Sequence, residues 1–196
     1  MPVAAWRKFA PLYFYTAVAL CLSFASAGQL LPASSVALLL ASGFFTWSLI
    51  EYGLHRFIFH YNARSPLGRK ILYQAHLSHH EDPTASDRIF ASLFLSAPIA
   101  ATYWLLAWVA TGSWAAASWL FIGMSAGYFW YEWLHFQCHH GRSHFRIIRY
   151  LRKYHLLHHY KTPELRFGVT SPLLDVVFGT FSPSSEPNDL QRRRTK

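Results

Sequence analysis

The sequence has few charged residues for its length. Asp, Glu, Lys and Arg make up 14% of the 196 residues, whereas hydrophobic residues make up 53% and aromatic residues 18%. A soluble domain of this size ordinarily carries more charge on its surface. The composition therefore argues against a soluble protein that hides apolar helices inside a polar shell.

Two long stretches have no charge at all, residues 9–50 and 89–131. Each is about twice the roughly 20 residues that cross a bilayer as a helix. Turn-forming residues lie near the middle of each stretch, at Gly28 and Pro32 and at residues 111–113. Each stretch therefore predicts two membrane-spanning helices joined by a short loop, four spans in all. A secretory signal peptide is the alternative for the first stretch, which is long for one and lacks a clear cleavage pattern.

Cysteine is also scarce. The two cysteines are Cys21 and Cys138, and Cys21 lies inside the first predicted span. A disulfide framework is therefore not expected. The glycine-rich fingerprint GxGxxG of dinucleotide-binding folds is absent as well, so no bound dinucleotide is expected.

The basic residues are distributed unevenly about the predicted spans. The net charge is +9, and the two short loops inside the charge-free stretches carry no Lys or Arg. The positive-inside rule then places both termini in the cytoplasm. We expect the basic surplus to meet anionic lipid head groups rather than nucleic acid. Residues 1–181 are predicted to form a single membrane domain, and residues 182–196 a polar basic tail.

The sequence is rich in histidine, and its twelve histidines all follow the second or the fourth predicted span. An HxxHH pattern occurs twice, in HLSHH from residue 76 and in HLLHH from residue 155. On an α-helix these three positions share one face. His135 and His139 also lie one helical turn apart. His55 and His60 are five apart, about 140° around an α-helix, so they flank a site unless the helix is distorted there.

The histidines also suggest an internal repeat of about eighty residues. In that alignment His55 corresponds to His135 and His60 to His140, while the second trio follows the first by 79 residues. Two hairpins that cross the same bilayer would be similar in length without common descent. The matching histidines nevertheless favour two related halves of the same orientation.

Clustered imidazoles predict metal binding, because imidazole is the commonest metal ligand near neutral pH. Ten clustered histidines are too many for one ion and about right for two. Catalytic zinc needs about three protein ligands, and imidazole also suits iron, copper and nickel, so the ligand type leaves the metal open. Neutral ligands favour an electrophilic centre that activates O2. A metal-storage patch or histidines that titrate at a membrane surface are the alternatives.

Four motifs carry a family resemblance. HRFIFH, HLSHH, HFQCH and HLLHH, in this order, resemble the histidine boxes of the integral-membrane fatty acid hydroxylase/sterol desaturase superfamily. The run RKYHLLHHYKTPELRFGVTSPLLDVVFGTF is most similar to the fatty-acid 2-hydroxylase branch. The resemblance covers about residues 49–181. It implies an all-α integral membrane fold, with four transmembrane helices in two hairpins and a cytosolic helical cap that holds a dimetal centre.

The resemblance also implies the ligand set. The box HFQCHH favours His139, whereas the internal repeat favours His140. We take His139 as the ligand and expect His140 and His144 beside the ligands or on the surface. Glu51 and Glu132 are expected to accept hydrogen bonds from ligand imidazoles. The expected metal ligands are His55, His60, His76, His79, His80, His135, His139, His155, His158 and His159.

The implied activity is O2-dependent hydroxylation of a lipid acyl chain, most similar to 2-hydroxylation of a fatty acid or of a sphingolipid acyl chain. The implied cofactors are two iron ions, for which zinc can substitute, with O2 as co-substrate. Electrons are expected from a separate cytochrome b5-like or ferredoxin-like protein. The alternatives are a membrane lipid desaturase or carotenoid hydroxylase of the same superfamily, and a metal transporter, which the lack of polar residues within the spans disfavours.

Overall fold

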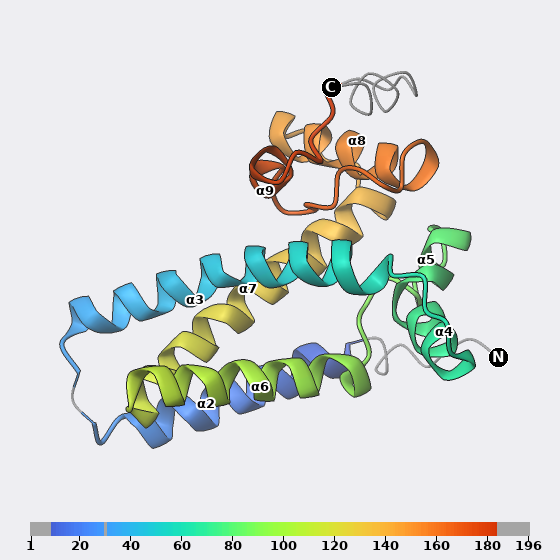
Figure 1. Ribbon diagram of the computed structural model, residues 1–196. Coiled ribbons are helices and arrows are strands. Elements are labelled where there is room, and N and C mark those ends of the chain that lie inside the picture. The colour runs from blue at the N-terminus through green and yellow to red at the C-terminus, as the bar shows by residue number, and fades with distance from the viewer. Residues whose placement is uncertain (1–8, 30, 184–196) are drawn as a thin grey trace. The chain divides into compact units, whose positions relative to one another are not determined.

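The computed structural model describes residues 9–29 and 31–183, and each regular element within them is helical (Figure 1). The chain divides into two compact units, each built from two separate stretches. The first unit comprises the residues up to Trp47 together with Phe90–Glu132. The second unit comprises Ser48–Ile89 and the residues from Trp133 onward. The expected all-α class is therefore confirmed.

The first unit contains two pairs of helices. Its elements are α2 (Ala10–Ser26), the first part of α3 (Ala33–Gly53), α6 (Leu93–Thr111) and most of α7 (Trp114–His140). The helices break at the predicted turns, and Gly112 ends α6 with a positive φ of 62°. This left-handed conformation favours glycine because a Cβ would clash with the backbone.

Helices α3 and α7 pack closely within the first unit. A Cβ on Gly123 would collide with the carbonyl oxygen of Leu40, and one on Gly43 with that of Leu120. Gly123 and Gly127 form a GxxxG pattern, which lets two helix backbones approach when no water drives their association. This pattern is visible in the sequence and indicates the contact between the two helices.

Two helical stretches are long and apolar enough to cross a membrane, Ala33–Phe59 and Leu93–Thr111. Only 6% and 11% of their most apolar segments are buried, unlike the core helices of a soluble protein. The apolar helix α2 is shorter, at 17 residues. The structure therefore provides two candidate spans, while the four-span arrangement and its sidedness stay predictions.

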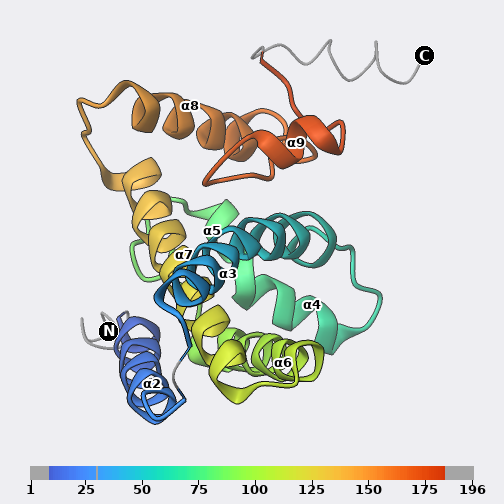
Figure 2. The same ribbon diagram turned by 90° about the vertical axis from the view of Figure 1, so that its left-hand side faces the viewer.

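The second unit begins at the end of α3 and contains short helices and two π-helices. These are the π-helix η1 (Leu54–Phe59), α4 (Pro66–Leu72), the π-helix η2 (Tyr73–Leu77), α5 (Ser78–Glu81), the end of α7, α8 (Arg146–Tyr160) and α9 (Leu173–Val177). Figure 2 shows α9 beside α8. Ser65 caps α4 by accepting a hydrogen bond from the Gly68 N–H at 3.1 Å, as the N-cap preference of serine predicts.

Helix α8 buries one face and exposes the other. Ile148 and Leu151 pack with Leu134 of α7 in the core, whereas Arg149 and Lys153 are exposed. The buried face also carries histidines, so core packing fixes their direction. Ser182, the first residue of the predicted tail, is buried, and its carbonyl oxygen accepts from Arg166 at 3.0 Å. Residues 184–196 of the predicted tail lie outside the described residues.

Candidate metal centre

Ten of the twelve histidines lie in two groups of five, both inside the second unit. Within each group the potential ligand nitrogens all lie within 4.8 Å of one another. The first group comprises His55, His60, His76, His80 and His158, and the second comprises His79, His135, His139, His155 and His159. These are the ten residues expected as ligands. His140 and His144 are outside both groups and exposed, and the ring of His140 stacks on Phe136 at 5.0 Å.

The composition of the two groups follows the internal repeat. Each group takes the histidine pair of one half and the first and last histidines of the same half's HxxHH trio. Each then takes the middle histidine of the other half's trio, so that His158 joins the first group and His79 the second. This reciprocal exchange ties the two halves of the chain together at the site.

The π-helix η1 explains how His55 and His60 reach the same group. In a π-helix the hydrogen bonds run from i to i+5, so residues five apart lie nearly one above the other. His55 lies in η1 and His60 follows its last residue, and their ring centroids are 5.1 Å apart. The distortion that a five-residue spacing required is therefore present. His135 and His139, four apart, share a face of the ordinary α-helix α7.

The hydrogen bonds of two first-group histidines fix their tautomers. The Nδ1 of His158 lies 2.7 Å from the Leu165 carbonyl oxygen, and the Nδ1 of His55 lies 2.6 Å from that of Phe167. Because a carbonyl only accepts, Nδ1 carries the proton in each ring and Nε2 presents its lone pair. The Nε2 of His55 is buried without a hydrogen-bond partner in the described part of the chain. This is the arrangement of a metal-binding imidazole held from behind.

The separations between the Nε2 atoms fit bound cations. The Nε2 of His158 lies 3.1 Å from that of His60 and 3.2 Å from that of His80. In the second group, the Nε2 of His79 lies 3.1 Å from that of His139 and 3.0 Å from that of His135. Two nitrogens bound at right angles to one metal at about 2.1 Å would be about 3.0 Å apart. The measured separations match that value, so the donor set fits two metal ions.

The two groups are adjacent. The ring of His80, in the first group, stacks on that of His159, in the second, with centroids 4.1 Å apart and planes 24° apart. His155 and His158, one from each group, lie nearly parallel at 6.1 Å. Both trios thus face one place, as their shared helical face predicts. Metal ions in the two groups would be near neighbours.

Burial keeps the imidazoles neutral. It lowers the pKa of His60 to about 4 and that of His80 to about 3. In the second group it lowers the pKa of His79 to about 3 and that of His139 to about 4. Loss of water disfavours the charged imidazolium in each case. At neutral pH these rings therefore keep the unprotonated nitrogen that a metal needs.

The two glutamates accept hydrogen bonds from the main chain. The oxygens of Glu51 accept from the Val169 N–H at 2.5 Å and from the Thr170 N–H and hydroxyl at 3.0 and 2.6 Å, and the expected bonds from ligand imidazoles stay a prediction. Glu132 accepts from the Ala91 N–H at 3.2 Å. The physical reason is that buried backbone N–H groups need acceptors, and the loop after Leu165 brings its own to Glu51. Glu51 therefore holds that loop.

Asp175 supports the same loop and is fully buried. Its carboxylate accepts from the N–H groups of Phe167 and Gly168 at 2.8 and 2.9 Å and from the Thr180 hydroxyl at 2.7 Å. Phe167 is also the residue whose carbonyl meets His55. Asp175 thus positions the candidate ligand His55, because it holds the backbone of Phe167, whose carbonyl contacts the His55 ring. The spacing of residues in the sequence does not indicate this role, because only the folded loop reveals the partners of Asp175.

Comparisons with known proteins agree with this geometry. The family model described as fatty acid hydroxylase matches residues 40–180. The dihydroceramide fatty acyl 2-hydroxylase FAH1 of Arabidopsis thaliana is 34% identical over 183 residues, which are 92% of this chain and 76% of that protein. The ceramide very long chain fatty acid hydroxylase SCS7 of Saccharomyces cerevisiae is 39% identical over 143 residues, 71% of this chain.

A solved structure is also similar. It is described as full-length scs7p in which only the hydroxylase domain is visible, and it matches with a TM-score of 0.81 and 31% identity over 91% of this chain and 67% of that one. The chain spans only 36% of the yeast SCS7 sequence. The match to the family model includes all four histidine boxes, since each lies within residues 40–180. The chain belongs to the fatty acid hydroxylase family.

Proposed function

We propose that this protein hydroxylates a lipid acyl chain with O2 at two metal ions held by the ten grouped histidines. The observation that carries the proposal is the pair of adjacent five-histidine groups, whose nitrogens are neutral and separated as ligands of a shared ion. Two ions bound there, iron in the working enzyme, would supply the reduction of O2 and the insertion of one oxygen atom into a C–H bond. The names of the relatives support an acyl chain of a ceramide or fatty acid as the substrate, and carbon 2 as the position.

The balance of the reaction requires a partner. Hydroxylation with O2 converts C–H to C–OH and reduces the second oxygen atom to water, which consumes two electrons and two protons. The proposed source of these electrons is a separate donor protein, cytochrome b5-like or ferredoxin-like. The site and both termini lie on the cytoplasmic side in this proposal, where such a donor can dock.

The protein contributes positioning. The carbonyls of Leu165 and Phe167 orient His158 and His55, and Asp175 and Glu51 hold the loop that carries those carbonyls. Apolar helices, two of them long enough to cross a bilayer, give access to lipid. Because proximity selects the carbon that reacts, the acyl carbon next to the carbonyl must be held beside the histidines for 2-hydroxylation.

Comparative lipid mass spectrometry tests the proposal. Cells that express the protein together with a donor should contain acyl chains that have gained one oxygen, and fragmentation should place it on carbon 2. The variant His158→Ala should lose the product, whereas His140→Ala, which changes an exposed histidine outside both groups, should keep it. Chains that lose two hydrogens instead would identify a desaturase. Unchanged lipids with a metal-loaded protein and an active donor would refute the proposal.

A further inference from the structure

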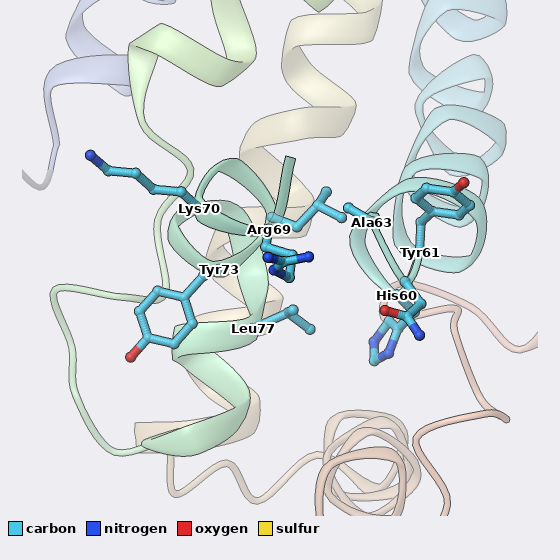
Figure 3. Close-up of a pocket in the computed structure, with 9 residues that line it drawn as sticks. His60, Tyr61, Ala63, Arg69, Lys70, Tyr73 and Leu77 are labelled. Carbon is cyan, nitrogen blue, oxygen red and sulfur yellow. The ribbon is translucent and has the colours of Figure 1, made fainter. Parts of the chain in front are cut away.

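A pocket of about 580 Å³ opens beside the first histidine group (Figure 3). It lies between the end of η1, the following loop, α4 and η2, all within the second unit. Its lining comprises His60, Tyr61, Asn62, Ala63, Arg69, Lys70, Leu72, Tyr73 and Leu77. His60 connects the pocket to the candidate metal centre, because its Nε2 lies 3.1 Å from that of His158. Anything bound in the pocket is therefore next to the first group.

The lining of the pocket is mostly apolar, and its charged side chains are cationic. Two of its nine residues are cations, Arg69 and Lys70, and none is acidic. Figure 3 shows the guanidinium of Arg69 among the lining side chains, between Lys70 and His60, whereas the ammonium of Lys70 extends away from both. Arg69 donates a hydrogen bond to the Arg64 carbonyl at 2.7 Å, which holds its head in place. Outside the lining, the Glu81 carboxylate already accepts from the Tyr73 hydroxyl at 2.6 Å.

The surroundings of the pocket suit a membrane surface. Phe57 and Ile58 of η1 are 58% and 49% exposed, and Leu67 of α4 is 68% exposed. The candidate span Ala33–Phe59 ends one residue before His60, so the pocket begins where that helix would leave the hydrocarbon. Exposed apolar side chains beside Arg and Lys are typical of the level where lipid tails meet their head groups.

We propose that this pocket binds the anionic polar end of the acyl substrate, a carboxylate or a phosphate, through the guanidinium of Arg69, with the neighbouring charge of Lys70 adding attraction. The pocket has the size and the mostly apolar lining of a small-molecule site with a few polar groups that set orientation. Arginine and lysine are the side chains that bind carboxylates and phosphates through charge-assisted hydrogen bonds. An anion held there places the first carbons of the chain next to His60. This inference rests on the proposed function, and it adds the preferred chemistry of the head group.

Binding to the metal-loaded protein in a neutral detergent tests the inference. Three probes with the same chain length are titrated: dodecanoate, dodecyl phosphate and the neutral dodecanamide. We expect both anions, or one of them, to bind more tightly than the amide, and the tighter anion shows whether a carboxylate or a phosphate is preferred. Lys70→Gln should weaken anion binding about fivefold, the order expected for one exposed charge pair, and leave amide binding unchanged.

Lys153→Gln is the matched control, because Lys153 is exposed on α8, does not line the pocket and gives the same change of charge. It should leave anion binding unchanged. Arg69→Gln is a second variant, and unchanged metal content would show that it folds despite losing its bond to Arg64. Equal binding of the amide and the anions, or an equal loss in Lys70→Gln and Lys153→Gln, would overturn the inference.

Turnover separates this inference from the proposed function. If the wild type hydroxylates acyl chains while Lys70→Gln keeps the same KM for an anionic substrate, the head-group assignment is wrong and the function stands. If the anions bind in the expected order but no substrate is hydroxylated, the proposed function is wrong. We expect KM to rise in Lys70→Gln with little change in kcat, because the cation attracts the head group equally in the bound substrate and in the transition state.

Discussion

At the scale of the residue, the sequence identified the histidines better than the groups that orient them. The four boxes named the ten histidines now found in the two groups, and the choice of His139 over His140 agrees with the geometry. The roles of Glu51 and Asp175 were not readable, because both bind backbone N–H groups of a loop more than a hundred residues from Glu51. A carboxylate that binds main chain leaves no trace in the spacing of side chains.

Replacing Asp175 tests this support. In Asp175→Asn one amide N–H must face a backbone N–H, which leaves a buried donor unpaired at a cost of about 1–3 kcal/mol. We expect a lower melting temperature and less metal in the first group, since the Phe167 carbonyl that orients His55 is no longer fixed. Asp87→Asn, at an exposed position, serves as the control. Full metal content and an unchanged melting temperature in Asp175→Asn would contradict the role assigned to this residue.

Cys138 gives a prediction about pH. Burial raises the pKa of this thiol to about 12, so the reactive thiolate is disfavoured and remains scarce as the pH rises from 7 to 9. Cys138 should therefore react very slowly with N-ethylmaleimide throughout this range, whereas unfolding in detergent should expose it to fast modification. Peptide mass spectrometry measures both. Modification of native Cys138 at the rate seen in the unfolded chain would show that the end of α7 is not packed as described.

At the scale of the element, helix ends were predictable and helix type was not. Glycine and proline marked the turns between the helices of each hairpin, and the helices break there. The five-residue spacing of His55 and His60 indicated a distortion, but only the structure shows a π-helix in η1 and another in η2. No single residue type encodes a π-helix. It forms here where the packing of the second unit requires an extra residue per turn.

Shortening η1 tests its role. Deletion of Ile58 leaves three residues between the two histidines, which are then four apart. An ordinary α-helix would satisfy that spacing, and the residues after it would rotate. We expect the first group to lose its metal, because His60, His76 and His80 follow the deletion. The second group should keep one ion on its four members other than His79. Ile58→Val keeps the length of η1 and should retain both ions. Two ions in the deletion variant would show that the π-helix is dispensable for the site.

At the scale of the whole molecule, composition and the repeat predicted an all-helical chain with two hairpins. The histidine exchange between the halves, His79 into one group and His158 into the other, required the folded chain, because the repeat alone pairs each trio with its own half. The fold of the chain does not fix the number of spans. Two helical stretches have the length and apolarity of a span. The position of a bilayer around them depends on surroundings that the fold of the chain does not specify.

The exchange also makes the central claim measurable, since the two groups depend on each other. The decisive measurement is the number of metal ions per chain in the purified protein, determined by elemental mass spectrometry after loading with iron or zinc. The wild type and His140→Ala should each hold two ions, and His158→Ala should hold at most one. A wild type that holds one ion or none, or a His140→Ala variant that loses as much metal as His158→Ala, would contradict a centre of two ions built from these ten histidines.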